Sequence, residues 1–160
     1  MKKIFLLIAI VFSLTSNAQV THVSLKASGL TCSMCSNSIN KALKTLDFIL
    51  TIEADISTYT FELCFKSNSV VDFDLIKKKV ENAGFTVAGF VATVLFDNVQ
   101  VLNSQAVTID GKTFLFTGVK EQTLNGARKI KVLDKGFVSP KEYKKSAFPV
   151  LATHTYTVTL

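Results

Sequence analysis

The stretch "VSLKASGLTCSMCSNSINKAL", Val23 to Leu43, decides the fold of the first half of the chain. Apolar and polar residues alternate in its first part, which is typical of a strand with one buried face. Its last part places Ile39 and Leu43 at the spacing of a helix that lies on a core. Between these parts lies "GLTCSMC", with Cys32 and Cys35 three positions apart. The two cysteines are therefore predicted to lie where a strand leads into a helix.

The residues up to about 91 continue this alternation of patterns. Two further alternating runs, 50–56 and 59–65, are separated by a short break and predict an antiparallel hairpin with Leu50, Ile52, Ala54 and Ile56 turned inward. A second helical stripe over residues 73–83 ends at Gly84, and another strand begins near residue 85. The order β-α-β-β-α-β predicts an α+β fold, a four-stranded antiparallel sheet with both helices on one face.

Cysteines with this spacing can hold a metal ion, exchange electrons or close a turn. The N-terminal end of a helix carries a partial positive charge, which favours the thiolate form. Two thiolates suit Cu(I), whereas zinc normally takes four ligands and no second Cys or His pair is present in the sequence. Thioredoxin-type enzymes share the same spacing, so the motif alone leaves a redox role open.

Residues 20–90 as a whole resemble the heavy-metal-associated domain of copper chaperones and copper-transporting ATPases. The family signature G-M-T-C-x-x-C is similar to "GLTCSMC", and "IKKKVENAGFTV" resembles the family's second helix with its Gly-Phe element. The resemblance implies a ferredoxin-like fold and assigns Cys32 and Cys35 as metal ligands, with Phe85 in the loop that shields them. It further implies Cu(I) as cargo, with Zn, Hg or Cd as other candidates, and a protein partner that donates or accepts the metal. Leu30 replaces the family's usual Met at a packing position.

Four other side chains are of types that can bind a metal ion. Met34, between the cysteines, is either a soft third donor or an adaptable apolar residue. Cys64 is expected on the sheet face opposite the helices, as a buried inert thiol or as a partner in an intermolecular disulfide. His22, at the start of the first strand, and His154, on the apolar side of the last strand, are not assigned as ligands.

The first 18 residues have the pattern of a secretory signal peptide. Lys2 and Lys3 precede the apolar run 4–14, and small residues lead to a cleavage site after Ala18. This predicts export to the periplasm or the medium, with no integral membrane segment left after cleavage. In an oxidising compartment the cysteine pair can form a disulfide, which would prevent metal binding.

Residues 91–160 predict a small, mostly β domain. Short strands are expected near 92–96, 99–101, 106–109, 113–116, 128–133 and 153–160, with a helix from Ser139. Asp110-Gly111 and Asn125-Gly126 are typical hairpin turns. The strands predict a small barrel or sandwich resembling an OB fold, which carries nine basic and five acidic residues. The charges are not interleaved with aromatic residues, so nucleic-acid binding is not expected.

These observations favour a non-enzymatic, exported protein that binds a soft metal ion through Cys32 and Cys35 and passes it on by ligand exchange. On this hypothesis the fragment Val20 to Phe90 should bind metal alone. A thiol-disulfide oxidoreductase is the rival, although no Trp precedes the motif and no Pro lies within it. A structural or adhesive protein that has lost metal binding is the third alternative.

Overall fold

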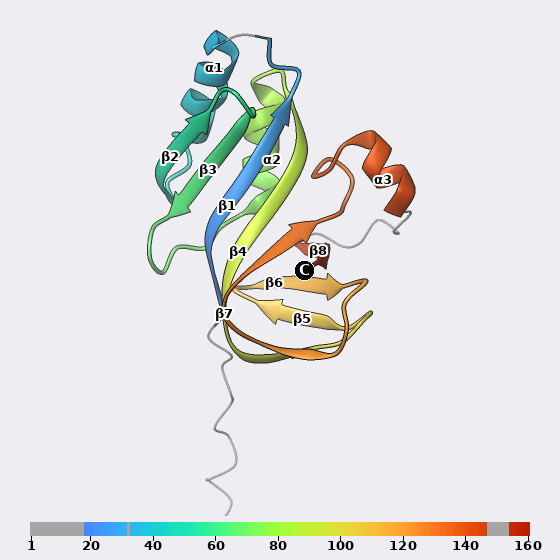
Figure 1. Cartoon of the computed structure of the whole chain (residues 1–160). Coiled ribbons are helices and arrows are strands. Elements are labelled where there is room, and N and C mark those ends of the chain that lie inside the picture. Colours follow the sequence, from blue (N-terminus) through green and yellow to red (C-terminus); the bar gives the residue numbers. More distant parts are fainter. Residues whose placement is uncertain (1–17, 32, 147–153) are drawn as a thin grey trace, which may run out of the picture.

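A computed structural model describes residues 18–31, 33–146 and 154–160 of the chain (Figure 1). Its elements follow one another as β1 (Gln19–Ser28), α1 (Ser33–Leu43), β2 (Ile49–Asp55), β3 (Thr60–Phe65), α2 (Phe73–Asn82), β4 (Thr86–Val101), β5 (Ala106–Ile109), β6 (Lys112–Phe116), β7 (Gln122–Val132), α3 (Pro140–Ser146) and β8 (Thr155–Thr159). All strands belong to one eight-stranded sheet in the order β2-β3-β1-β4-β7-β8-β6-β5. Within the described ranges, no helix has the length and apolar character needed to cross a membrane.

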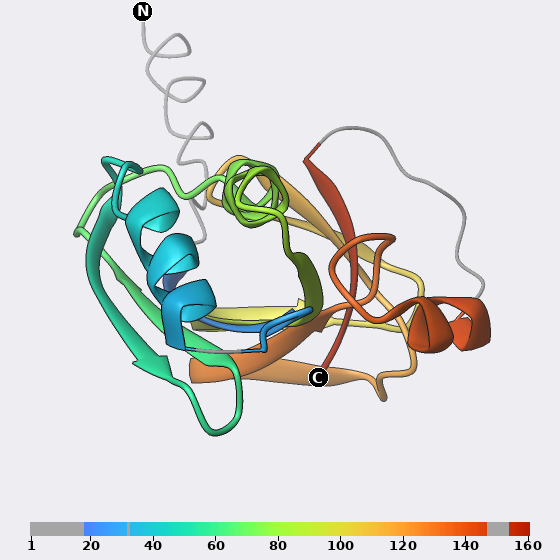
Figure 2. The same cartoon turned by 90° about the horizontal axis from the view of Figure 1, so that it is seen from above.

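The first half has the predicted β-α-β-β-α-β order. β1 pairs antiparallel with both β3 and β4, and β2 pairs antiparallel with β3. Figures 1 and 2 show α1 and α2 on the same face of these four strands. The ferredoxin-like arrangement predicted from the periodicity is confirmed.

The boundaries of α2 follow from its sequence. Asp72 is the N-cap, and its side chain accepts a hydrogen bond from the backbone N–H of Leu75 at 2.9 Å. The chain leaves the helix through Gly84, whose φ of 90° is a conformation that glycine adopts without strain. The residues that α2 buries lie at helical spacing: Phe73, Ile76 and Val80.

β4 is a single strand of 16 residues that joins the two halves of the chain. It pairs with β1 through its first ten residues and with β7 from Val91 to Val101. The sequence predicted three strands here, because Asp97 and Asn98 interrupt the alternation. In the structure these residues form an irregularity in the pairing with β7, and the strand continues beyond it. β7, β8, β6 and β5 therefore extend the sheet of the first half, and the predicted OB-like barrel is not confirmed.

Of the two predicted hairpin turns, the structure contains the first and not the second. Asp110 and Gly111 connect β5 to β6 with φ values of 50° and 71°, as a two-residue turn of this sequence requires. Asn125 and Gly126 instead lie inside β7, so the second predicted turn is wrong. Gly126 has a φ of 70° and faces Phe96, next to the irregularity in β4, where it bends the strand without ending it.

The inward face predicted for β2 is right for Ile52, which packs against the core, but wrong for Leu50 and Ile56. Leu50 is 63% exposed and Ile56 is 50% exposed, whereas Ile49 is buried. A shift in the pairing of β2 with β3 between Ile49 and Thr51 changes which side chains face the helices. Because β2 is an edge strand, it has a neighbouring strand on one side only.

Five aromatic residues, which we call the aromatic joint, hold the two halves together. The ring of Phe73, in the first turn of α2, lies 4.9 Å from Phe90, 5.2 Å from Tyr156 and 6.1 Å from Phe114, measured between centroids. Phe137 lies edge-on to Phe90 at 5.1 Å. All five are at most 2% exposed. The members come from α2, β4, β6, β8 and the segment before α3, so both halves share one core.

Asp134 links the end of β7 to β8, and the effect of its buried charge on the stability of the fold can be tested. Its carboxylate accepts a hydrogen bond from the backbone N–H of Thr157 at 2.8 Å. Burial nevertheless raises the pKa of Asp134 above its ordinary value. The folded protein thus holds the proton more tightly than the unfolded chain, so stability falls as the pH rises through the pKa of the folded state. Asp134→Asn should therefore raise the Tm at pH 7, because the amide oxygen can still accept from Thr157 without a buried charge.

Thermal unfolding from about pH 3, where an ordinary Asp is mostly protonated, to pH 7 measures this effect. The advantage of Asp134→Asn should shrink toward the acidic end. Asp47→Asn, at an exposed position, is the matched control and should leave the Tm unchanged. A lower Tm for Asp134→Asn at pH 7 would mean that the charged hydrogen bond to Thr157 outweighs the cost of burial.

Candidate metal-binding loop

The loop between β1 and α1 turns sharply at its first residue. Gly29 has a φ of 91°, a left-handed conformation that a side chain disfavours. A Cβ atom at this position would lie 3.9 Å from the ring of Phe85, so the Phe85 ring lies directly beside the loop. Leu30 is buried at 8% exposure, in agreement with its predicted packing role, and Thr31 is exposed. The loop is therefore anchored at Leu30 and exposed to solvent at Thr31.

Cys35 lies in the first turn of α1 and is half-buried against the core. Its Sγ atom is 4.0 Å from the Oγ1 atom of Thr31, within the range of a weak hydrogen bond to sulfur. The first turn of α1 has no acidic residue, so no carboxylate on that turn offsets the positive end of the helix. Cys32 lies outside the described residues, and its assignment as a ligand stays a prediction.

Apolar side chains are exposed at this end of the molecule. Met34, in the first turn of α1, is 78% exposed, so it does not pack as an apolar residue under the loop. The hairpin between β2 and β3 reaches the same end, because the carbonyl of Tyr59 accepts a hydrogen bond from the N–H of Ala27 at 3.0 Å. Ile56 is 50% exposed and Tyr59 is 39% exposed on this hairpin. The sequence pattern missed this surface because it assigned both residues to strands.

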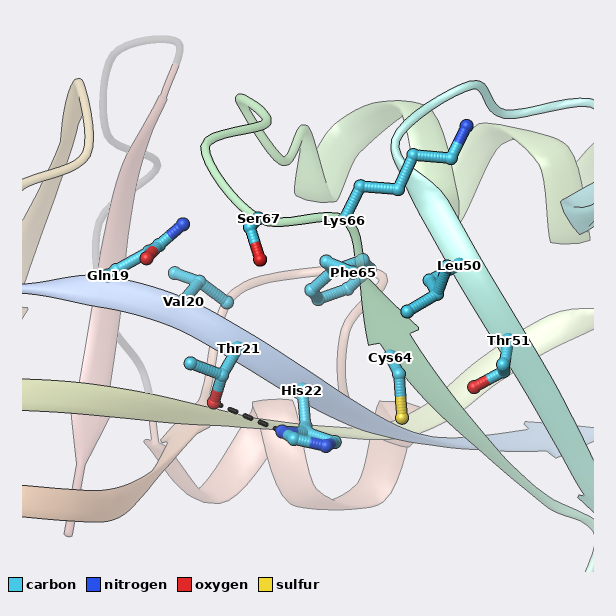
Figure 3. A pocket seen from close by; sticks show the side chains of 10 residues that line it. All are labelled: Gln19, Val20, Thr21, His22, Leu50, Thr51, Cys64, Phe65, Lys66 and Ser67. Carbon is cyan, nitrogen blue, oxygen red and sulfur yellow. Dashed lines mark hydrogen bonds between the residues drawn. The ribbon is translucent and has the colours of Figure 1, made fainter.

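Cys64 lies on the sheet face opposite the helices, as predicted, but it is half-buried instead of buried. It is the cross-strand partner of His22, and both residues line an open hollow over β1, β2 and β3 (Figure 3). The imidazole Nδ1 of His22 lies 3.1 Å from the hydroxyl of Thr21. This hollow is near the start of β1, whereas Cys35 follows its end. Cys64 is therefore not brought to the loop.

The position predicted for His154 is wrong. It precedes β8, is exposed, and has a φ of 59°. The final strand begins one residue later, and three consecutive residues of it are buried: Tyr156, Thr157 and Val158. β8 lies between β7 and β6, and both of its faces are covered. The alternation in its sequence therefore does not distinguish a solvent-exposed face from a buried face.

Comparison with known proteins places this loop in a family. The family model described as the heavy-metal-associated domain matches residues 24–86. A copper transporter domain of yeast, Ccc2a, solved in apo and Cu(I) states, is 30% identical to the chain. The match covers 42% of this chain and 90% of that domain, with a TM-score of 0.38. This chain belongs to the heavy-metal-associated domain family.

Two further solved structures are similar to the same part of the chain. A copper-binding domain from HMA7, a P-type ATPase, is 29% identical over 41% of this chain and 86% of its own, with a TM-score of 0.37. The CopZ metallochaperone is 18% identical over 42% of this chain and all of its own, with a TM-score of 0.39. No curated protein matches the chain significantly. The matched heavy-metal-associated domain ends at the first residue of β4, so the aromatic joint is built from both sides of that boundary.

Proposed function

We propose that this protein is an exported carrier that binds a soft metal ion, Cu(I) before Zn, Hg or Cd, through Cys32 and Cys35. The position of Cys35 carries this proposal. Its thiol lies in the first turn of a helix with no acid in that turn, at the open side of the loop, within a heavy-metal-associated domain. A helix start of this kind favours a thiolate over a thiol, and thiolates prefer Cu(I).

Transfer to a partner follows from the low coordination number that Cu(I) accepts. An incoming thiolate of the partner forms a third bond to the metal, and a bond to Cys32 or Cys35 then breaks. Repetition of this exchange moves the ion without releasing it to water. The exposed apolar side chains of Met34, Ile56 and Tyr59 offer a docking surface next to the loop. The chain needs no catalytic residue for this task, and we propose that it is not an enzyme.

Anaerobic titration of the reduced mature chain, residues 19–160, tests the proposal. Cu(I) is added in competition with a chelator of known affinity, and Zn(II), Cd(II) and Hg(II) are titrated in parallel. We expect one Cu(I) per chain, bound more tightly than Zn(II). Catalytic reduction of insulin without copper uptake would instead support the oxidoreductase. If the protein neither takes up copper nor shows redox activity, the structural or adhesive role is the remaining alternative.

Export is the part of the proposal that rests on residues 1–18. The charged and apolar segments of this stretch and the small residues before Gln19 are typical of a cleaved leader, which supports export. We expect protein recovered from the periplasm or medium of an expressing bacterium to begin at Gln19, as read by N-terminal sequencing or intact mass. A chain that stays in the cytoplasm with its N-terminus intact would contradict export and leave the proposed metal binding untouched.

A further inference from the structure

A second group of potential ligands lies away from the cysteine loop, where α2 begins and β8 begins. Asp72 and Asp74 come from the start of α2, and His154 precedes β8. Their ligand atoms all lie within 4.8 Å of one another. The loop with Cys35 is near the opposite end of α2, because that helix ends at Asn82, shortly before Phe85, whose ring lies beside Gly29 of the loop. The group is therefore separate from the proposed copper site.

Both carboxylates are held in place by other bonds. One oxygen of Asp72, Oδ1, caps α2 by accepting from the N–H of Leu75, so its second oxygen is not used by the cap. The Oδ2 atom of Asp74 accepts a hydrogen bond from the phenol of Tyr156 at 2.9 Å. Such an outer partner orients a ligating carboxylate.

His154 is fixed through its backbone. Its carbonyl accepts a hydrogen bond from the N–H of Thr113 in β6 at 2.9 Å, and its φ of 59° is in the left-handed region. Residues other than glycine adopt this conformation uncommonly, although His is enriched among those that do. The result is an exposed imidazole next to two oriented carboxylates.

We propose that Asp72, Asp74 and His154 form a second metal site, for a divalent cation of borderline hardness such as Zn(II). Oxygen and imidazole ligands suit zinc, whereas Cu(I) selects thiolates. Three protein ligands with water in the fourth position are a common zinc arrangement. Ligand atoms around tetrahedral zinc lie about 3.4 Å apart, since each bond is about 2.1 Å. The ligand atoms lie within 4.8 Å of one another, so rotation of the exposed imidazole of His154 and small shifts of the carboxylates would bring them to this spacing.

Two positive groups oppose a cation here and limit its affinity. The ammonium of Lys77 lies 3.4 Å from Oδ1 of Asp74, and the N-terminal end of α2 carries a partial positive charge. Lys77 has a second contact, because its Nζ also lies 4.7 Å from the ring centroid of Phe137, so it can release Asp74 and keep that contact. We therefore expect weaker zinc binding than in a closed four-ligand site.

The proposed site would connect the heavy-metal-associated domain to the last strand. Zinc bound only in the folded state stabilises it by mass action, and here it would tie α2 to β8 next to the aromatic joint. Its oxygen and nitrogen ligands differ from thiolates, so the chain could carry Cu(I) and Zn(II) at once.

The test uses the mature chain with Cys32→Ser and Cys35→Ser, so that zinc cannot bind the thiolates. Zn(II) should raise the Tm of this protein in a concentration-dependent way, with one ion per chain in a calorimetric titration. Co(II) as a substitute should give visible d–d absorption without the thiolate charge-transfer band. Adding His154→Asn should abolish both responses, because Asn tolerates the left-handed conformation but removes the imidazole.

Matched variants separate the site from general effects. His22→Asn removes the other histidine and should keep the full zinc response. Asp72→Ser keeps an N-cap while removing the carboxylate, and should weaken the response with little change in the metal-free Tm. An unchanged Tm with Zn(II), or an equal response in the His154→Asn protein, would overturn the proposal. Since all the proteins in these experiments lack Cys32 and Cys35, the result for zinc does not depend on whether the cysteines bind copper.

Discussion

Replacing Cys32 and Cys35 together by serine is expected to abolish tight Cu(I) binding. A hydroxyl is a hard, neutral ligand, and Cu(I) requires soft donors. Loss of an outer-sphere partner alone typically weakens a metal site ~10- to 100-fold. Removing both donor atoms should exceed that range and leave no binding in competition with the chelator. The measurement is the same anaerobic competition titration, with stoichiometry read from metal analysis.

Cys64→Ser is the matched control for the loss of a thiol. Cys64 lies on the open sheet face beside His22, away from the loop, so its removal should leave Cu(I) affinity unchanged. The double variant should also keep its Tm, because Cys35 is only half-buried and the serine side chain is close in size. Copper affinity that survived in the double variant, or that vanished with Cys64, would place the site elsewhere.

Phe73→Ala is expected to destabilise the whole chain by about 3–5 kcal/mol, the usual cost of removing a buried Phe. Phe73 is fully buried and contacts three members of the aromatic joint, from both halves of the chain. Ala cannot fill the space, so Phe90, Phe114 and Tyr156 would lose a shared partner. Chemical denaturation followed by far-UV circular dichroism and by tyrosine fluorescence measures the change. Val70→Ala, at a position 72% exposed, should have almost no effect.

The number of unfolding transitions is as informative as the midpoint of unfolding. Since the joint contains residues of both halves, the two probes should report one transition that shifts as a unit. Two separate transitions, with only one moved by Phe73→Ala, would show that the halves are independent. For the same reason, the fragment from Val20 to Phe90 is a poor test of metal binding. It ends in the middle of β4 and lacks Phe114, Phe137 and Tyr156.

The first half could be predicted because its patterns are local. The helical spacing of Phe73, Ile76 and Val80 reflects one buried face, and the alternation in β1 and β3 does the same for the sheet. "GLTCSMC" identified the loop because the spacing of its cysteines carries chemistry of its own. Cys35 was placed correctly at the start of α1, while the location of Cys32 is still a prediction.

The second half was predicted less well because its determinants are distant in sequence. Asp97-Asn98 and Asn125-Gly126 resemble strand ends, yet they lie at the same place in the pairing of β4 with β7, where Gly126 pairs with Phe96 and Asp97-Asn98 form the irregularity. β8 pairs in parallel with β6, a strand some forty residues earlier in the chain. Neither fact has a local signal. The grouping of Asp72, Asp74 and His154 was missed for the same reason, since 80 positions separate the last two.

β4 also gives the molecule two ends that are far apart. Thr86 pairs with Ser28 beside the cysteine loop, and Val101 pairs with Gln122 near the β5–β6 hairpin (Figure 1). At about 3.3 Å per residue, this strand has a contour length of about 50 Å. Two macromolecules bound at opposite ends of β4 would therefore not clash with each other. If the cysteine loop passes a metal ion to a partner as proposed, the opposite end of β4 would stay accessible to a second molecule during that exchange.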